Sequence, residues 1–474
     1  MNDTMSIFDY LYPKYKITKP IRLIEMFSGY GSQALALKYL GVPFEHWKIC
    51  EWAVKSIKAY KDIHFAEDNK DYSKDLTKEE LQEYLLNKGI SSNYNEPMFK
   101  LQIDRLNENT LRGIYNDIQA THNLVNIQQV KGKDLEIVDT DKYDYILTYS
   151  FPCQDLSLAG KGKGMSDTST RSGMLWEVER ILTECHELET MPQILLMENV
   201  PQVHGADNVQ DFNKWQLRLE ELGYKNYFQD LIATDYGIPQ TRNRCFMVSI
   251  LGDYSYTFPK PIPLKLKLKD MLEDNVDEKY YLSDKMKQYI FSEDDKYKTT
   301  REGWTRADTS DYITQEFGNK SLQETLEQNN INDTCYIDTY NKRIDKDKSG
   351  TITTGVSFRN NTFLAIKKET SKAIRETIEM YDNLKPNQFI DAYNRKIKDD
   401  NNAGTIATRV DLQGVCDNNL RIRKLTPREC FRLMGVKDED YEKCAKNQSD
   451  SSLYHLAGDS IVVNVLMAIF KELI

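Results

Sequence analysis

Closely spaced cysteine and histidine pairs are missing from this sequence. Its eight cysteines include no C-x-x-C pair, and its six histidines are scattered along 474 residues. Zinc sites and disulfide-stapled domains depend on such spacings. The sequence therefore supports neither a metal site nor a disulfide framework, and it is typical of reduced, cytoplasmic thiols.

Long apolar runs are also missing. No run approaches the roughly 20 residues that a membrane span needs, and residues 1–19 lack the apolar centre of a signal peptide. We therefore expect no contact with a membrane and a cytoplasmic location.

An excess of positive charge is absent as well, since the formal net charge is −10. This total does not exclude a nucleic-acid-binding function, because such a protein needs only a local basic surface. Lys265, Lys267 and Lys269 alternate along a strand-like run, and other basic residues cluster between 421 and 432. For the lysine run, phosphate contact and a solvated charged face are equally good explanations.

A cysteine after a strand-like segment is the most informative feature that is present. Residues 143–149 (YDYILTY) are typical of a buried strand, and the segment FPCQDLS with Cys153 follows, before a glycine-rich loop at 160–164. In α/β enzymes, loops at the carboxyl ends of strands carry the sites. A lone Pro-Cys turn is more often structural, so the other segments decide its interpretation.

Two N-terminal segments are typical of a nucleotide-binding sheet. Residues 21–27 predict a strand, the turn SGYGS follows, and an apolar helical pattern ends at Gly41. The turn lacks a full G-x-G-x-x-G pattern, so it does not indicate a dinucleotide. A second strand ends at Glu51 and Trp52, where a carboxylate can bind ribose hydroxyls and an indole can stack on adenine. A solvated helix start and an ordinary core tryptophan are the alternatives.

Three later segments carry further candidate groups. Residues 193–200 predict a buried strand that ends with Glu198, whose pKa burial would raise. Gln240, Arg242 and Arg244 alternate at the start of another strand and share one face. Residues 456–464 (LAGDSIVVN) form a turn that opens the last apolar helix.

In this order, the segments strongly resemble the C5-cytosine DNA methyltransferase family, over roughly 1–60, 130–270 and 420–474. The resemblance implies an α/β fold, with a Rossmann-like S-adenosylmethionine methyltransferase domain and a small, mostly β target-recognition domain. It implies double-stranded DNA as partner, a flipped-out cytosine as substrate and S-adenosylmethionine without a metal as cofactor. It also allows for a cognate restriction endonuclease as a further partner. We expect a monomer.

The resemblance also assigns residues. The catalytic set comprises the nucleophile Cys153, the acid Glu198, and Arg242 near the base, with Gln240 and Arg244 in support. The cofactor set comprises Phe27, Ser28, Gly29, Tyr30, Gly31, Glu51, Trp52, Asp134, Leu135, Pro152, Asp459 and Ser460.

This sequence departs from the family pattern in three places. Ser32 replaces a usual glycine, and Asp459 replaces a usual asparagine, which adds charge near the cofactor. The stretch from about 61 to 130 is far longer than usual. Its Thr77-Lys78-Glu79-Glu80 capping box predicts a mostly helical, ordered insertion.

The expected domains are a catalytic and cofactor-binding domain at 1–250, a target-recognition domain and hinge at 251–452, and a C-terminal helix at 453–474 that returns to the first. Prolines 259, 261 and 263 mark the linker. The middle region contains a repeat, because DTYNKRI at 338–344 resembles DAYNRKI at 391–397, and SGTITT and AGTIAT follow.

Two alternatives stay open. One is the transfer-RNA branch of the same family, against which the large recognition region argues. The other is a non-catalytic DNA-binding relic, against which the complete set of Cys153, Glu198 and Arg242 argues. A thiol, an acid and arginines suit cytosine methylation, because C5 becomes nucleophilic only after a thiolate adds to C6.

Overall fold

The computed structural model describes residues 12–152, 172–280 and 425–474, together with Gln388 and seven short strands between 335 and 424. The chain divides into two compact units. The first comprises Met1–Glu273, Asn401–Val410 and Thr426–Ile474, and the second comprises Asp274–Asp400 and Asp411–Leu425.

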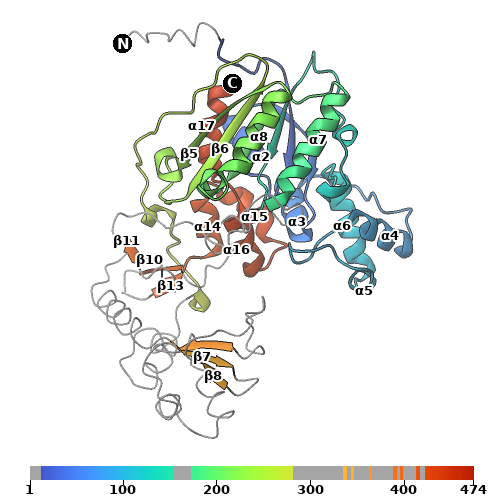
Figure 1. The fold of residues 1–474 in the computed structure, drawn as a ribbon. Helices are drawn as coiled ribbons and strands as arrows, with labels where there is room; N and C mark the ends of the chain where they lie inside the picture. Colours follow the sequence, from blue (N-terminus) through green and yellow to red (C-terminus); the bar gives the residue numbers. More distant parts are fainter. Residues whose placement is uncertain are drawn as a thin grey trace, which may run out of the picture. The chain divides into compact units, whose positions relative to one another are not determined.

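A six-stranded sheet lies at the centre of the first unit, in the order β2-β1-β3-β4-β6-β5 (Figure 1). Strands β2, β1, β3 and β4 are parallel, and β6 pairs antiparallel with both β4 and β5. The bounds are β1 Ile21–Met26, β2 Phe44–Cys50, β3 Asp144–Tyr149, β4 Ile194–Asn199, β5 Tyr224–Ile232 and β6 Asn243–Leu251. Every residue of β1, β3 and β4 is buried, as parallel strands covered on both faces require.

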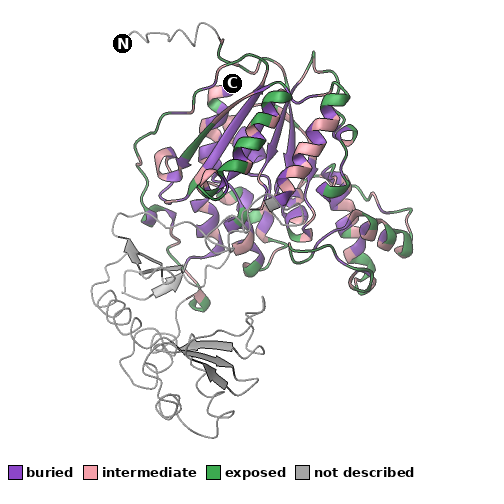
Figure 2. Ribbon diagram, viewed as in Figure 1, coloured by how far each residue is buried: buried purple, intermediate pink, exposed green. Residues whose placement is uncertain are grey.

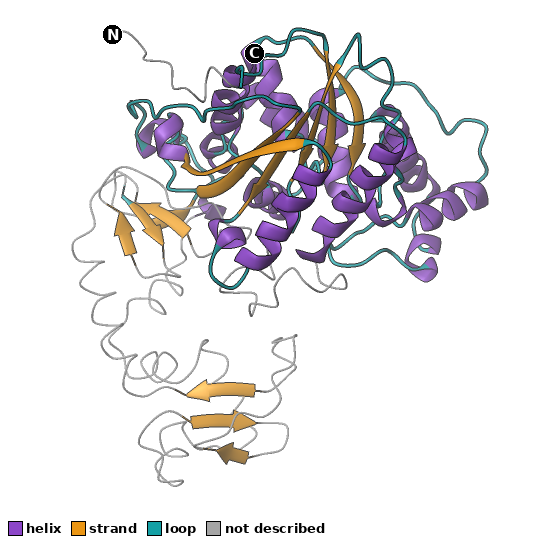
Figure 3. Cartoon of the chain, turned by 45° about the horizontal axis from the view of Figure 1, so that its top comes forward, coloured by secondary structure: helices purple, strands orange, loops and turns teal. Residues whose placement is uncertain are grey.

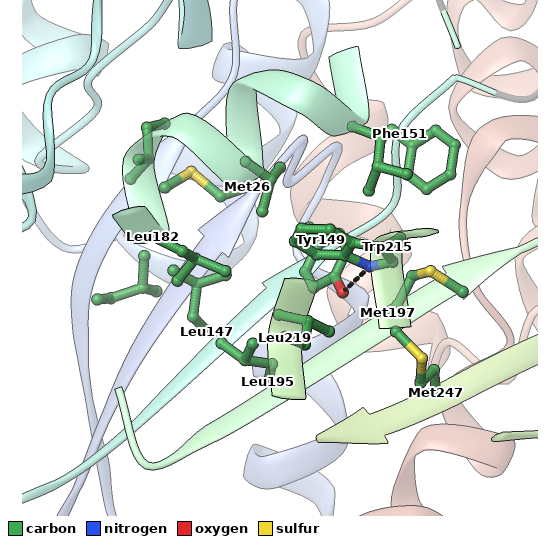
Figure 4. Packing of buried hydrophobic residues seen from close by; sticks show 14 of the residues in the cluster. Met26, Leu147, Tyr149, Phe151, Leu182, Leu195, Met197, Trp215, Leu219 and Met247 are labelled. Atoms are coloured by element: carbon green, nitrogen blue, oxygen red, sulfur yellow. Dashed lines mark hydrogen bonds between the residues drawn. The ribbon is translucent and has the colours of Figure 1, made fainter. Parts of the chain in front are cut away.

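Helices cover both faces of this sheet (Figure 3). The elements are α2 (Ser32–Leu40), α3 (Val54–His64), α7 (Leu175–Glu187), α8 (Val209–Glu221) and α17 (Val463–Leu473). Helices α7 and α8 bury apolar side chains against β3 and β4, and Trp215 Nε1 donates to the Tyr149 hydroxyl at 3.1 Å (Figure 4). The outward sides of both helices are largely exposed or half-buried (Figure 2). The predicted Rossmann-like α/β fold is confirmed.

Between α3 and β3 the chain forms three α-helices, α4 (Lys78–Lys88), α5 (Lys100–Asp104) and α6 (Glu108–Ala120). They share an apolar cluster that includes Leu81, Leu85 and Leu111. The predicted capping box at α4 is confirmed, because the Thr77 side chain accepts from Glu80 N and Glu80 accepts from Thr77 N. This part of the chain therefore has a small core of its own, next to α3.

One stretch of the described residues, Asp450–Leu473, is long and apolar enough to cross a membrane by length and composition. This corrects the expectation that no run approaches that length. The stretch consists of α16 (Asp450–Asp459) and α17, separated by a break at Ser460, and 61% of its apolar window is buried. Packing in the core accounts for its apolar character.

The boundary between the units differs from the expected one at residue 250, because the second unit begins at Asp274. The proline-rich stretch packs on the first unit, where Tyr236 donates its hydroxyl to Pro259 O at 2.9 Å and Ile262 N donates to Asp235 O at 2.9 Å. The segment that begins at Thr426 also belongs to the first unit. It contains α14 (Pro427–Leu433) and α15 (Asp438–Ala445), and α15 packs on α3.

Most of the described residues of the second unit are in strands, and a short 3₁₀ helix lies at Glu278–Tyr280. One sheet has the order β8-β7-β9, and the other has the order β11-β10-β12-β13. The bounds are β7 Cys335–Asp338, β8 Arg343–Asp345, β9 Thr362–Ala365, β10 Phe389–Asp391, β11 Lys396–Lys398, β12 Gln413–Cys416 and β13 Ile422–Lys424. Each copy of the sequence repeat thus forms the hairpin of its own sheet.

Candidate active site and cofactor pocket

The turn between β1 and α2 is built from left-handed backbone positions. Phe27, Gly29 and Gly31 have φ values of 58°, 54° and 85°. A Cβ atom at Gly31 would lie 2.4 Å from His64 Nε2 and 2.6 Å from Tyr60 Cε2, so only glycine fits there. At Gly29 the same position is open. The turn thus combines one sterically closed glycine with one that leaves room beside the backbone.

Glu51, after β2, holds this turn in place. Its Oε2 accepts from Gly29 N at 3.0 Å, and its Oε1 accepts from Ala53 N at 2.8 Å. Burial raises the pKa of Glu51 to about 7, and these hydrogen bonds oppose the shift. Trp52 lies half-buried against the apolar cluster of the insertion.

A pocket opens beside the turn and is lined by segments that are far apart in the sequence. Its described lining comes from the β1–α2 turn, the start of α3, the insertion, the end of β3 and the end of α16. The residues are Phe27, Ser28, Gly29, Ser32, Gln33, Ser56, Tyr94, Ser150, His455, Leu456, Asp459, Ser460 and Ile461. The Ser28 hydroxyl is buried there with no hydrogen-bond partner among the described residues, so it is available to a bound polar molecule.

The end of α16 connects the pocket to the rest of the site. Tyr30 donates its hydroxyl to Ser460 Oγ at 2.7 Å, and the buried Tyr30 ring stacks on Phe431 at 5.2 Å. Arg242 donates to the carbonyl oxygens of Ser460 at 2.8 Å and Gly458 at 3.2 Å. Arg242 therefore fixes the backbone of one pocket wall.

Asp459 has a nearby cationic partner when His455 is protonated. Asp459 Oδ2 lies 3.0 Å from His455 Nε2, one helical turn earlier on α16. The charge that the asparagine-to-aspartate departure adds therefore lies next to an imidazole rather than alone.

Several residues of the predicted cofactor set lie outside the described lining of the pocket. Asp134 Oδ2 accepts from Lys131 N at 2.9 Å and so caps a short 3₁₀ turn. Leu135 is fully buried, and its carbonyl oxygen accepts from Trp47 Nε1 at 2.8 Å. Pro152 is the last residue of the described range 12–152.

Glu198 is the penultimate residue of β4, next to the antiparallel strand β6, which contains Arg244. It is buried, and its Oε1 is 3.2 Å from Arg244 Nε. Burial raises the pKa of Glu198, whereas the charges of Arg244 and Arg242 lower it. The net upward shift favours a carboxyl that keeps its proton to higher pH than an exposed glutamate does.

Two amide side chains fix the surroundings of this acid. Gln240 Nε2 donates to Leu433 O at 2.6 Å and thereby joins the start of β6 to α14. Asn199 Nδ2 donates to Phe151 O at 3.0 Å, so the end of β4 holds the chain just before Cys153. Cys153 and the glycine-rich loop at 160–164 lie outside the described residues.

His204, Asp230 and Cys245 form a separate group whose ligand-type atoms lie within 4.8 Å of one another. His204 Nε2 is already 2.9 Å from Asp230 Oδ1, and burial raises the pKa of the Cys245 thiol. The group is therefore satisfied by its own contacts, with a protonated thiol.

The model of the C-5 cytosine-specific DNA methylase family matches residues 86–474. The chain belongs to this family. It is 31% identical over 458 residues to the type II methyltransferase M2.ScrFI of Lactococcus lactis subsp. cremoris, which covers 96% of this chain and 99% of the relative. It is 36% identical over 300 residues to the orphan methyltransferase M.SssI of Spiroplasma monobiae, which covers 62% and 75%. Among solved structures, the Entamoeba histolytica methyltransferase EhMeth matches with a TM-score of 0.48 at 14% identity, covering 96% and 98%.

The chain is thus a DNA (cytosine-5) methyltransferase.

Several residues that line its pocket or support its site were not predicted from the sequence. Ser56, Ser150 and Tyr94 line the pocket, and Asn199 anchors the chain before Cys153. Asn199 had a signal, since it directly follows Glu198 at the end of a buried strand. Ser150 directly follows the β3 strand. Tyr94 had no such signal in the sequence, because it lies in the insertion, which the family pattern does not include.

Proposed function

We propose that this methyltransferase modifies cytosine within a specific sequence of double-stranded DNA, through a covalent bond between Cys153 and C6 of the flipped-out base. The contact of Arg242 with Ser460 carries the proposal. It joins the strand pair that presents Glu198 to the wall of the pocket, so the acid and the pocket belong to one site.

The pocket suits S-adenosylmethionine. Glu51 lies at the end of the second strand, where a carboxylate binds ribose hydroxyls. The Ser28 hydroxyl and the open side of Gly29 offer further polar contacts. When bound, the cofactor supplies an electrophilic methyl group.

The chemistry begins when the Cys153 thiolate adds to C6 of cytosine and breaks the aromaticity of the ring. Glu198 donates a proton to N3 and so offsets the negative charge that develops on the ring. The enamine carbon C5 then takes the methyl group, which breaks the methyl–sulfur bond and leaves the cofactor as a neutral thioether. Loss of the C5 proton to water re-forms the C5–C6 double bond and expels Cys153 as a thiolate, and N3 returns its proton to Glu198.

The second unit is proposed to recognise the target sequence, because it is rich in strands and contains two related hairpins. Extrusion of the target base from the duplex costs a few kcal/mol, which contacts with DNA must repay. We also propose that the enzyme acts as a monomer in the cytoplasm, and that a cognate endonuclease would share its target.

Cys153→Ser tests the covalent mechanism. A serine alkoxide is much scarcer than a thiolate at neutral pH, so we expect methyl transfer to fall by at least a thousandfold while cofactor binding persists. The measurement uses labelled S-adenosylmethionine with double-stranded DNA and, in parallel, transfer RNA. Substantial turnover of the purified variant would refute the mechanism, and label in transfer RNA alone would refute the substrate. Bisulfite sequencing of DNA from expressing cells would give the target sequence.

A further inference from the structure

One loop of the insertion is fixed next to the cofactor pocket by main-chain hydrogen bonds. Met98 N donates to Ile90 O at 2.7 Å and closes the base of the loop. Ser91 N donates to Trp52 O at 2.7 Å, and Val54 N donates to Ser91 O at 2.9 Å. The loop is therefore attached to the segment that directly follows Glu51.

Tyr94 lies inside this loop in a conformation that non-glycine residues rarely adopt, with a φ of 63°. Asn93 Oδ1 accepts from Asn95 N at 2.9 Å and from Glu96 N at 3.2 Å, which forms a tight turn around the tyrosine. A left-handed backbone is unfavourable for a residue with a side chain, because its Cβ comes too close to the following carbonyl oxygen. Such strain tends to persist at functional positions.

The Tyr94 side chain forms part of the pocket wall. Its ring packs on His455, with ring centroids 4.0 Å apart, and its buried hydroxyl lies beside Ser56. The carboxylates of Glu51 and Asp459 are near enough to help burial raise the pKa of this hydroxyl. Tyr94 therefore lies in the pocket wall and close to the carboxylates of Glu51 and Asp459.

We propose that Tyr94 is a cofactor-binding residue that the insertion supplies, and that its ring packs against the nucleoside end of S-adenosylmethionine. His455 packs against the ring and pairs with Asp459. Trp52, whose indole was expected to stack on adenine, packs on the apolar cluster of the insertion. Tyr94 joins Phe27 as an aromatic side chain in the described lining of the pocket. The identity of the ligand rests on the proposed function.

Calorimetric titration of the full chain with S-adenosylhomocysteine tests the proposal. Tyr94→Gly removes the ring but retains the loop, because glycine adopts a positive φ without strain. We expect its affinity to be about 2- to 10-fold weaker, the range that one aromatic contact provides. Tyr94→Phe keeps the ring and should lie closer to wild type. In methyl transfer, Tyr94→Gly should raise KM for the cofactor and leave kcat within about twofold.

Tyr84→Ala is the matched control, because it removes a tyrosine ring from the same insertion. That ring contacts Tyr115 at 4.7 Å, and its hydroxyl accepts from Gln119 at 2.9 Å. We expect unchanged cofactor affinity for this variant. A folded Tyr94→Gly enzyme with unchanged or tighter affinity would overturn the proposal, as would a wild-type chain that does not bind the probe. A wild-type chain that binds the probe but leaves DNA unmethylated would refute the proposed function and leave Tyr94 to be judged by binding alone.

Discussion

The buried Glu198 and the half-buried Arg244 form an ion pair, and burial and charge shift the pKa of Glu198 in opposite directions. Burial raises the pKa of Glu198, and the adjacent guanidinium limits that rise. Arg244→Gln should therefore raise the pKa of Glu198 further. If Glu198 must be protonated to act at N3, the rate falls as pH rises through its pKa, and this fall should move to higher pH in the variant.

The pH profile of kcat, measured at saturating cofactor and DNA, checks this expectation. Arg218→Gln is a suitable control, because that arginine pairs with Glu179 and Glu221 on the outer helices. An alkaline limb that stays in place or moves to lower pH in Arg244→Gln would exclude a protonated Glu198 as the group that limits the rate.

At the scale of single residues, the sequence predicted the charge and pKa of side chains better than it predicted which residues they contact. The apolar strand before Glu198 indicated a buried acid, and its raised pKa is confirmed. Both alternating arginines lie near enough to lower that pKa, which their pattern in the sequence did not state. The partner of Asp459 was readable from helical i,i+4 spacing to His455, whereas the contact of Tyr94 with the same histidine joins residues more than 300 positions apart and leaves no local pattern.

At the scale of elements, α2 begins and ends with glycines that have different requirements. Gly31 and Gly41 have φ values of 85° and 70°. A Cβ at Gly31 would collide with His64 and Tyr60, but one at Gly41 would meet nothing within 4 Å. Gly41→Ala should therefore cost about 1–2 kcal/mol for the backbone alone. Gly31→Ala should cost about 1–3 kcal/mol more, from overpacking.

Urea unfolding of both variants measures the difference, since the two substitutions are chemically identical and flank one helix. Equal losses of stability would show that His64 and Tyr60 yield to the added methyl group. We also expect Gly31→Ala to weaken cofactor binding, because displacement of the turn moves Gly29 and its hydrogen bond to Glu51.

At the scale of elements, the sequence best predicted the features that depend on neighbouring residues. The capping box predicted at Thr77 is confirmed, because such a motif depends on only four residues, and the structure has a second one at Thr426. The strands β1, β3, β4 and β6 were similarly evident from apolar runs. Strand β5 was not predicted, because most of its residues are exposed or half-buried. The apolar stretch that ends the chain was underestimated, because the break at Ser460 divides it into two helices that share one core.

At the scale of the whole molecule, composition misplaced the boundary between the units. The prolines near residue 260 indicated a linker, but the structure packs that stretch against Tyr236 and Asp235. Such docking depends on the surface of a distant part of the chain, which composition does not encode. The repeat, in contrast, was evident in the sequence, and the two hairpins have the same register, because Asp338 pairs with Arg343 as Asp391 pairs with Lys396.

The equivalence of the two hairpins sharpens a prediction about target recognition. In each copy, a third strand pairs antiparallel with the first, so that Asp338 lies opposite Thr362 and Asp391 lies opposite Gln413. Because the backbones of the two hairpins pair in the same way, the copies differ in their side chains. The second copy has Arg409 where the first has Gly355. Both positions, like Lys342, lie outside the described residues.

We expect Arg409→Ala to relax or abolish sequence preference more than Lys342→Ala does. An arginine that reads guanine contributes about 1–3 kcal/mol of discrimination, whereas a phosphate contact adds affinity without sequence information. Methylation profiles of both variants on a randomised DNA library, at one fixed salt concentration, separate these roles. If Arg409→Ala keeps its activity and its sequence preference, the arginine does not read bases, and the paired hairpins serve to pack the recognition unit.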